Sequence, residues 1–131
     1  MRAIATVDGV HPPFANYSHA VEVPPGARTL FVSGQLGIAA DGTVPPDAEG
    51  QAELIFQAIA RILREAGMTM ANIVRLNAYV VDRADLPAYM AVRDRHVGAP
   101  PPASTLLLVA GFPRPEFRLE VEAVAARVDP R

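Results

Sequence analysis

With 131 residues, the chain is long enough for one hydrophobic core, and we expect a single domain over 1–131. The absence of cysteine excludes disulfides and cysteine-ligated zinc, and because all twelve basic residues are arginine, Schiff-base and P-loop lysines are excluded as well. A net charge of −2 argues against a surface that collects phosphate groups, so we expect no nucleic-acid partner.

Half of the residues are hydrophobic, and we expect other copies of the chain to cover part of this apolar surface. Residues 1–8 lack the continuous apolar stretch of a signal peptide, and no apolar run reaches the length of a membrane span. The sequence therefore predicts a cytoplasmic homo-oligomer with no membrane partner.

The first predicted elements are two strands joined by a turn. The β-prone runs 21–23 and 30–33 flank a Pro-Pro-Gly-Ala turn composition at 24–27. We therefore expect a hairpin whose second strand ends at Gly34.

A long amphipathic helix is predicted next, with Asp47 as its N-cap and Gly67 as its stop. Its apolar residues recur at the three- and four-residue spacing of one helix face, and charged residues fill the opposite face. The apolar set is Ala52, Ile55, Phe56, Ile59, Ile62, Leu63 and Ala66.

In the second half of the chain we predict a strand, a second helix and then two more strands. Residues 74–80 alternate between apolar and polar, which is typical of a strand covered on one face. We expect a helix from about Asp85 to Val97, and then a closing hairpin formed by 105–110 and 117–128. This order of elements predicts an α+β fold with two helices packed on one face of a mixed β-sheet.

Two carboxylates in the last predicted strand are the first candidates for chemistry. Glu120 and Glu122 lie two positions apart, so their side chains share one face of the strand while Leu119 and Val121 share the other. Such a pair serves acid–base catalysis where one carboxylate is desolvated, or it faces water as the outer side of an ordinary strand. The spacing alone leaves both interpretations open.

The histidine and glycine patterns point away from metals and nucleotides. His11, His19 and His96 are far apart in the sequence and form no metal-ligand spacing with carboxylates. The spacing Gly34-x-x-Gly37 lacks the third glycine of a dinucleotide-binding loop. We therefore expect no metal site and no cofactor.

Two further polar candidates lie at the edges of predicted strands. Tyr17 precedes a strand, where its phenol either lines a site or lies half-buried with its hydroxyl in water. Ser33 and Gly34 end a strand, and a glycine there lets a ligand approach backbone N–H groups. Each of these signals is weak alone.

Short motifs recur in a specific order along nearly the whole chain, from about 14 to 126. They are YSHAV at 17–21, FVSGQ at 31–35, AG at 66–67, and PA at 102–103 followed by LEVEA at 119–123. Together they resemble the YSxAV, VSGQ and PAR…(I/L)EIEA motifs of the RidA family, also called YjgF or L-PSP.

The resemblance implies a chorismate-mutase-like α+β fold assembled as a homotrimer with clefts between subunits. It also implies hydrolysis of enamines and imines released by PLP enzymes, giving a 2-oxo acid and ammonia. In that scheme Glu120 positions the attacking water, Tyr17 lines the cleft, and groups near Ser33 and Gly34 help to hold the substrate.

The chain departs from the family at the substrate clamp, because Ser104 stands where the family has an arginine after Pro-Ala. A hydroxyl lacks the bidentate, charge-assisted hydrogen bonds of a guanidinium, so we expect binding of a 2-imino acid to weaken by about ten- to a hundredfold. The hydroxyls of Ser104 and Thr105 could bind a smaller or neutral ligand instead, or another arginine such as Arg75 could reach the cleft.

The leading hypothesis is a deaminase or related hydrolase of a subgroup that lacks the clamping arginine, acting on a small imine- or enamine-type metabolite. Its catalytic residue is Glu120, and its substrate-binding residues are Tyr17, Ser33, Gly34, Ser104 and Thr105. The main alternative is a non-catalytic small-molecule binder on the same trimeric scaffold, motivated by Ser104. An endoribonuclease is the least favoured alternative, because the composition is lysine-free and mildly acidic.

Overall fold

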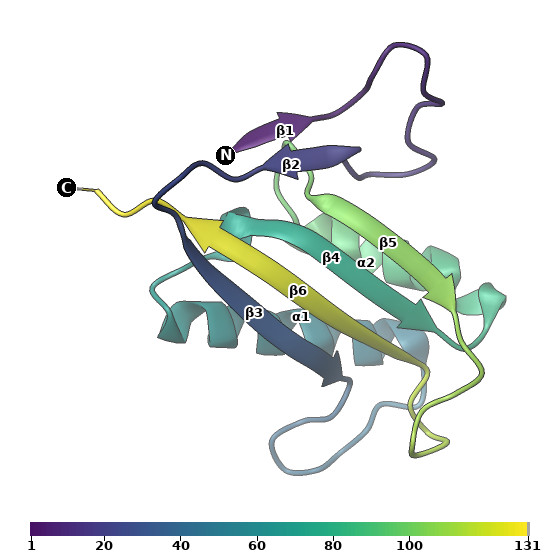
Figure 1. The fold of residues 1–131 in the computed structure, drawn as a ribbon. Helices are drawn as coiled ribbons and strands as arrows, with labels where there is room; N and C mark the ends of the chain where they lie inside the picture. Colours follow the sequence, from purple (N-terminus) through teal and green to yellow (C-terminus); the bar gives the residue numbers. More distant parts are fainter. Residues whose placement is uncertain (131) are drawn as a thin grey trace.

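A computed structural model describes residues 1–130 and shows a mixed four-stranded sheet with two helices on one face (Figure 1). Residue 131, the last of the predicted domain 1–131, lies outside the described residues. The helices and strands in chain order are β1 (Arg2–Ile4), β2 (Ala20–Glu22), β3 (Arg28–Leu36), α1 (Ala48–Glu65), β4 (Ile73–Val80), α2 (Leu86–His96), β5 (Ala103–Leu108) and β6 (Leu119–Arg127).

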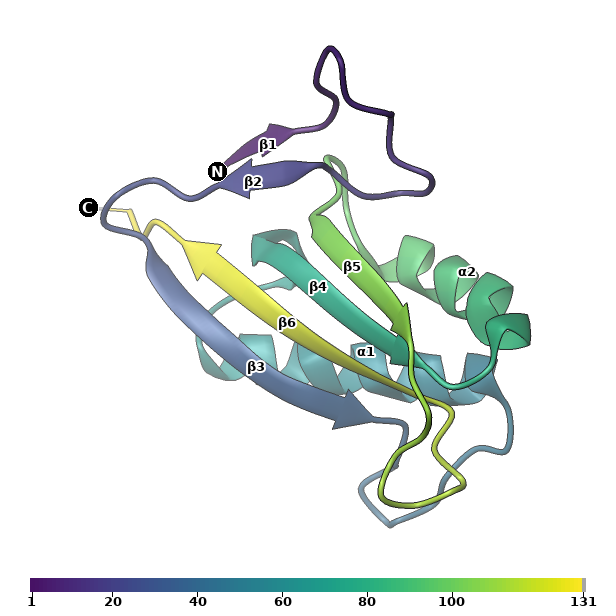
Figure 2. The ribbon, with the colours of Figure 1, turned by 45° about the vertical axis from the view of Figure 1, so that its right-hand side comes forward.

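The four long strands are arranged in the order β3-β6-β4-β5. Strand β6 is antiparallel to both of its neighbours, and β4 is parallel to β5. Helices α1 and α2 lie behind the sheet in both views, while β1 and β2 form a separate ribbon beyond one end of it (Figure 2). The α+β prediction, with two helices on one face of a mixed sheet, is confirmed.

Both predicted hairpins are wrong. Strand β2 pairs with β1 and not with β3, and β6 pairs with β3 and β4 and not with β5. The physical reason is that α1 and α2 are crossover helices: each connects two parallel strands, β3 to β4 and β4 to β5, and β6 then inserts between β3 and β4. The two strands of each predicted hairpin, β2 with β3 and β5 with β6, are therefore not partners.

The caps predicted for the first helix are confirmed. The Asp47 side chain accepts a hydrogen bond of 2.9 Å from the Gly50 N–H, and Gly67 adopts a φ of +70° just beyond the C-cap. The apolar stripe of α1 packs against the inward side chains of β3 and β6, as the alternation in these strands requires. The fully buried side chains of this core include Ile55, Phe56, Ile59, Leu63, Leu76, Val80, Leu119 and Val121.

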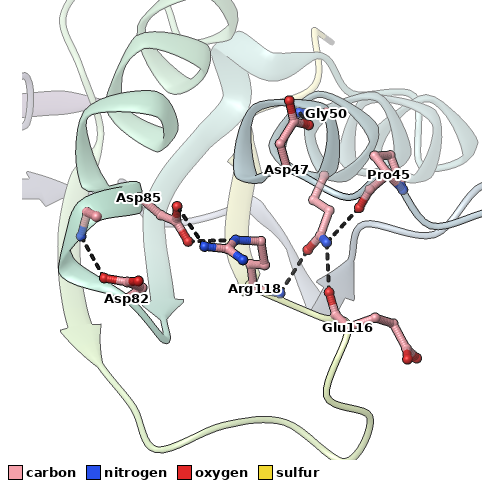
Figure 3. A network of polar contacts seen from close by, with 9 residues as sticks. Pro45, Asp47, Gly50, Asp82, Asp85, Glu116 and Arg118 are labelled. Carbon is pink, nitrogen blue, oxygen red and sulfur yellow. Dashed lines mark hydrogen bonds and ion pairs between the residues drawn. The ribbon is translucent and has the colours of Figure 1, made fainter.

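One buried amide, that of Gln51, connects α1 to the loops before the helix and before β6. Its Nε2 donates to the carbonyl oxygens of Pro45 and Glu116, each at 2.9 Å, and its Oε1 accepts from the Arg118 N–H at 2.8 Å (Figure 3). The Arg118 guanidinium also forms a forked ion pair with Asp85, with N–O distances of 2.9 and 3.2 Å. These contacts fix where β6 begins.

Candidate functional site

Tyr17 is positioned by the residue that follows it. The Ser18 N–H donates to the Pro102 carbonyl at 3.0 Å, and the buried Ser18 hydroxyl donates to the Pro101 carbonyl at 2.6 Å. Residue 18 thereby pairs in parallel with Ala103, the first residue of β5. This anchor holds the Tyr17 ring beside the start of β5, next to Ser104.

A cavity of about 220 Å³ lies between the segment before β2, helix α2 and strand β5. Ser104 faces it because its register partner on the parallel strand β4 is Leu76, whose side chain points to the helices. The polar side chains that line it are Tyr17, Arg93 and Ser104, and the remaining lining residues are Phe14, Ala15, Met90 and Leu106. The structure thus brings together two predicted site residues, Tyr17 and Ser104.

Arg93 is a site candidate that the sequence analysis missed. Only 4% of its side chain is exposed, and its Nε donates to Asp94 Oδ1 at 3.1 Å. Its guanidinium lies 5.8 Å from the centre of the Tyr89 ring. The sequence carries only a weak signal for this position: residue 93 lies one turn after Tyr89 and beside Val92 on the helix face that the structure buries.

Glu120 lies on the other face of the sheet, which no helix covers. Strand β3 bulges close to it, because the two residues Ser33 and Gly34, between the paired residues Val32 and Gln35, lie across from the single residue Glu122, whereas Glu120 pairs with Leu36. The carboxylate of Glu120 occupies the space above Gly34: a Cβ added there would lie 2.6 Å from the Glu120 Cδ and Oε1 atoms. Ser33, Gly34 and Glu120 therefore form a second group, and the glycine is what leaves room for the acid.

The neighbouring acid, Glu122, is already engaged. Its Oε1 accepts hydrogen bonds from Tyr79 Oη at 2.6 Å and from Asn77 Nδ2 at 3.1 Å. The bond to the carboxylate, together with burial, raises the pKa of Tyr79 above its ordinary value. Among the side-chain hydrogen bonds of residues 1–130, by contrast, none involves the Glu120 carboxylate.

Thr105 is separated from Ser104 by the alternation of the strand. Its Oγ1 accepts a hydrogen bond of 3.0 Å from Arg75 Nη2, on the open face of the sheet. Arg75 therefore does not enter the cavity that contains Ser104. The predicted site residues fall into two places within one chain: Tyr17 and Ser104 at the cavity, and Ser33, Gly34, Thr105 and Glu120 on the open sheet face.

The described residues 1–130 offer neither a metal site nor a membrane-spanning helix. No group of three or more His, Asp or Glu side chains is placed to hold a metal ion within these residues. In the same part of the chain, neither helix is long and apolar enough to cross a membrane.

Comparison with known proteins gives consistent matches over most of the chain. The family model described as Endoribonuclease L-PSP matches residues 9–127. Protein MMF1, mitochondrial, from Saccharomyces cerevisiae is 30% identical over 87% of this chain and 77% of that protein. A 2-iminobutanoate/2-iminopropanoate deaminase from Dermatophagoides farinae is 27% identical over 86% of both chains.

Solved structures give the same result for the fold. The crystal structure of YyfB, a protein of the Rid family from Yersinia pestis, superposes with a TM-score of 0.83 at 34% identity and covers 96% of this chain and 98% of that chain. With the family model spanning nearly all of the sequence and the α+β architecture shared, the chain belongs to the RidA/YjgF/L-PSP family.

Proposed function

We propose that the protein hydrolyses the C=N bond of a small reactive imine, or of the imine tautomer of an enamine. The observation that carries the proposal is the half-buried Glu120 carboxylate, which lies over Gly34 with no hydrogen-bond partner among the described residues. A carboxylate so placed can accept a proton from water. The name of the Dermatophagoides farinae relative, an iminobutanoate and iminopropanoate deaminase, supports the same reaction class.

In the proposed reaction, Glu120 accepts a proton from a water molecule while the water oxygen forms a bond to the imine carbon. Glu120 then gives this proton to the nitrogen, which yields a carbinolamine. The C–N bond breaks as Glu120 accepts the hydroxyl proton and passes it to the leaving nitrogen. The products are a carbonyl compound and ammonia, so one water is consumed for each imine. Because imines hydrolyse readily in water, orientation of the water by one carboxylate is sufficient catalysis.

The proposal requires more than one copy of the chain, because Ser104 and Glu120 lie on opposite faces of the sheet. We propose the homotrimer that the family resemblance implies, with Glu120 of one subunit facing the cavity of the next. The open face supports this: Phe31 on β3 is 77% exposed and Leu107 on β5 is 51% exposed, both on the side that no helix covers.

The catalytic proposal is tested by ammonia release from 2-iminopropanoate and from a neutral imine, each generated in situ. We expect acceleration by the wild-type protein and a loss of about a hundredfold in Glu120→Gln, the size of effect typical of removing a general base. Glu65→Gln, which neutralises an exposed acid on α1, is the matched control. Failure of the wild-type protein to accelerate either reaction, or full activity in Glu120→Gln, would overturn the proposal.

The assembly is tested by sedimentation velocity of Phe31→Glu. We expect the wild-type protein to sediment as a trimer and the variant as a smaller species, because a buried carboxylate without a partner is costly. Val10→Glu introduces the same charge at a similarly exposed apolar residue in the loop after β1 and should leave the assembly intact. A monomeric wild-type protein would contradict the assembly.

Ser104 favours one further candidate function, a binding protein without catalysis. If this is the function, a metabolite at a hundred times its Kd would stabilise the fold by about 2.7 kcal/mol. A thermal-shift screen combined with the ammonia assay distinguishes the two: stabilisation without turnover supports the binder, and turnover supports the hydrolase.

A further inference from the structure

The cavity beside Ser104 contains a charged group that the proposed reaction does not use, the guanidinium of Arg93. We propose that Arg93 binds the anionic group of the ligand, supplying from α2 the positive charge that β5 lacks at position 104. The ligand class is then a small monocarboxylate, such as a 2-imino acid and its 2-oxo acid product. This inference rests on the proposed function for the assignment of the cavity as the ligand site.

The first argument is the hydrogen-bonding capacity of the guanidinium. Arginine has five N–H donors, and Arg93 uses its Nε–H on Asp94. Within residues 1–130, its two terminal nitrogens donate to no carbonyl or carboxylate oxygen, and neither is among the buried atoms that lack a partner, so both are accessible from the cavity. A carboxylate can accept two parallel N–H bonds from these terminal nitrogens, and such bidentate, charge-assisted pairs are among the strongest hydrogen bonds in proteins.

The second argument is that the guanidinium is held in place before any ligand arrives. Asp94 Oδ1 accepts from Arg93 Nε at 3.1 Å and also from Asn16 Nδ2 at 3.2 Å, which ties α2 to the segment that carries Tyr17. The guanidinium also lies over the Tyr89 ring, with Arg93 Cζ 5.8 Å from the ring centre, within the range of a cation–π contact. A charged fork that is already oriented loses little entropy on binding.

The third argument is the electrostatic character of the cavity. Arg93 is the one charged side chain among its lining residues, and the only other polar side chains are Tyr17 and Ser104. The rest of the lining is apolar, so the cavity combines a single positive charge with hydroxyl groups and low polarity. Its volume of about 220 Å³ suits an anion of a few carbon atoms.

The test measures binding and not turnover. 2-Oxobutanoate and its neutral counterpart 2-oxobutanamide are titrated into the wild-type protein and Arg93→Gln by calorimetry, with Arg64→Gln, an exposed arginine on α1, as the charge-matched control. We expect the acid to bind the wild-type protein at least tenfold more tightly than the amide. In Arg93→Gln the acid should lose about ten- to a hundredfold in affinity while the amide is unchanged.

Asp94→Asn separates ligand binding from a purely structural role of the ion pair. Asparagine keeps an Oδ1 that can accept from Arg93 Nε and from Asn16, so the guanidinium stays in place, and it removes only the competing negative charge, so acid binding should be retained or strengthened. If Arg93 served only to pair with Asp94, both variants would lose affinity for acid and amide alike. That result, or equal affinity of the wild-type protein for acid and amide, would overturn the inference. The comparison of acid with amide in the wild-type protein and in Asp94→Asn can be read even if Arg93→Gln does not fold.

The outcomes also separate this inference from the proposed function. If the protein binds the acid more tightly than the amide but releases no ammonia, the hydrolase proposal is wrong and Arg93 remains the anion-binding residue. If the protein releases ammonia from charged and neutral imines at equal rates, the hydrolase proposal stands and the proposed role of Arg93 is wrong.

Discussion

Replacing Gly34 with alanine tests whether the position of the Glu120 carboxylate matters for activity. The added Cβ would lie 2.6 Å from Glu120 Cδ and Oε1, whereas comfortable contact between such atoms begins at about 3.5 Å. Gly34 is not among the residues with positive φ, so alanine strains no backbone torsion there. The side chain of Glu120 is the group that must move, by most of an ångström.

A displacement of this size has a large expected effect on a positioned base. Misplacement of a catalytic group by about 1 Å costs about a hundredfold in rate, which corresponds to about 2.7 kcal/mol of transition-state stabilisation. The free energy of unfolding should change little, because the carboxylate can rotate toward solvent. We therefore expect Gly34→Ala to lose most of its kcat/KM in the ammonia assay with a nearly unchanged urea midpoint.

Two controls make the result specific to Glu120. Gly111→Ala adds a methyl group where no heavy atom lies within 4 Å and should retain full activity. The double variant Gly34→Ala/Glu120→Gln should be no less active than Glu120→Gln alone, because the first change acts through the second residue. Wild-type kcat/KM in Gly34→Ala, or a full additional hundredfold loss in the double variant, would refute the reasoning.

Three other predictions concern stability, measured by urea unfolding. Gln51→Leu removes three hydrogen bonds and leaves their backbone partners unpaired, so the unfolding free energy should fall by about 3 kcal/mol; a loss below 1 kcal/mol would contradict this. Tyr89→Phe deletes a buried hydroxyl without a partner in residues 1–130, in a ring whose pKa burial raises to about 12, and should leave stability unchanged or raise it by up to about 1 kcal/mol. Burial raises the pKa of Glu53, but hydrogen bonds from His96 and Arg95 outweigh it and hold the pKa below its ordinary 4.5. The contribution of Glu53 to the free energy of unfolding is therefore complete above pH 4.5 and is lost as the pH falls through the lowered pKa. Glu53→Gln should weaken the loss of stability at acidic pH, and an unchanged dependence of the unfolding free energy on pH would contradict this.

The elements that depend on local chemistry were predictable from the sequence. The N-cap at Asp47, the stop at Gly67 and the alternation over 74–80 each follow from a hydrogen bond, a φ angle or a side-chain period that a few neighbouring residues determine. The second helix also lies where Asp85 and Pro87 indicated, because proline is compatible with a first helical turn.

Strand pairing was not predictable in the same way. An apolar run specifies which of its faces is buried but not which strand lies beside it, and the turn compositions at 24–27 and around Gly111 favoured hairpins that do not form. The pairing of β3 with β6 spans most of the chain, and it follows from the two crossover helices rather than from any local signal.

The candidate site divides in the same manner. Motif resemblance selected Glu120, Gly34, Tyr17 and Ser104, but one chain places them on two faces of the sheet, which no spacing in the sequence reveals. Arg93 was missed because a helical arginine is ordinarily assigned to the solvated face. Its buried position depends on the loop before β2 and on β5, which close over it only in the folded molecule.

Ser104 and Arg93 are linked by charge. An arginine at 104 would place a second guanidinium in a cavity of about 220 Å³ that already contains one. At a separation of about 5 Å and an effective dielectric constant of about 20, the two cations would repel by about 3 kcal/mol. The carboxylate of Asp94 can offset this only weakly, because it is itself 47% exposed and pairs through a single guanidinium nitrogen. A cavity that takes its positive charge from α2 therefore needs a small, uncharged residue on β5, and serine also supplies a hydroxyl toward the same ligand. If the proposed role of Arg93 holds, the serine at 104 complements the arginine at 93, and the positive charge for the anion comes from α2 and not from β5.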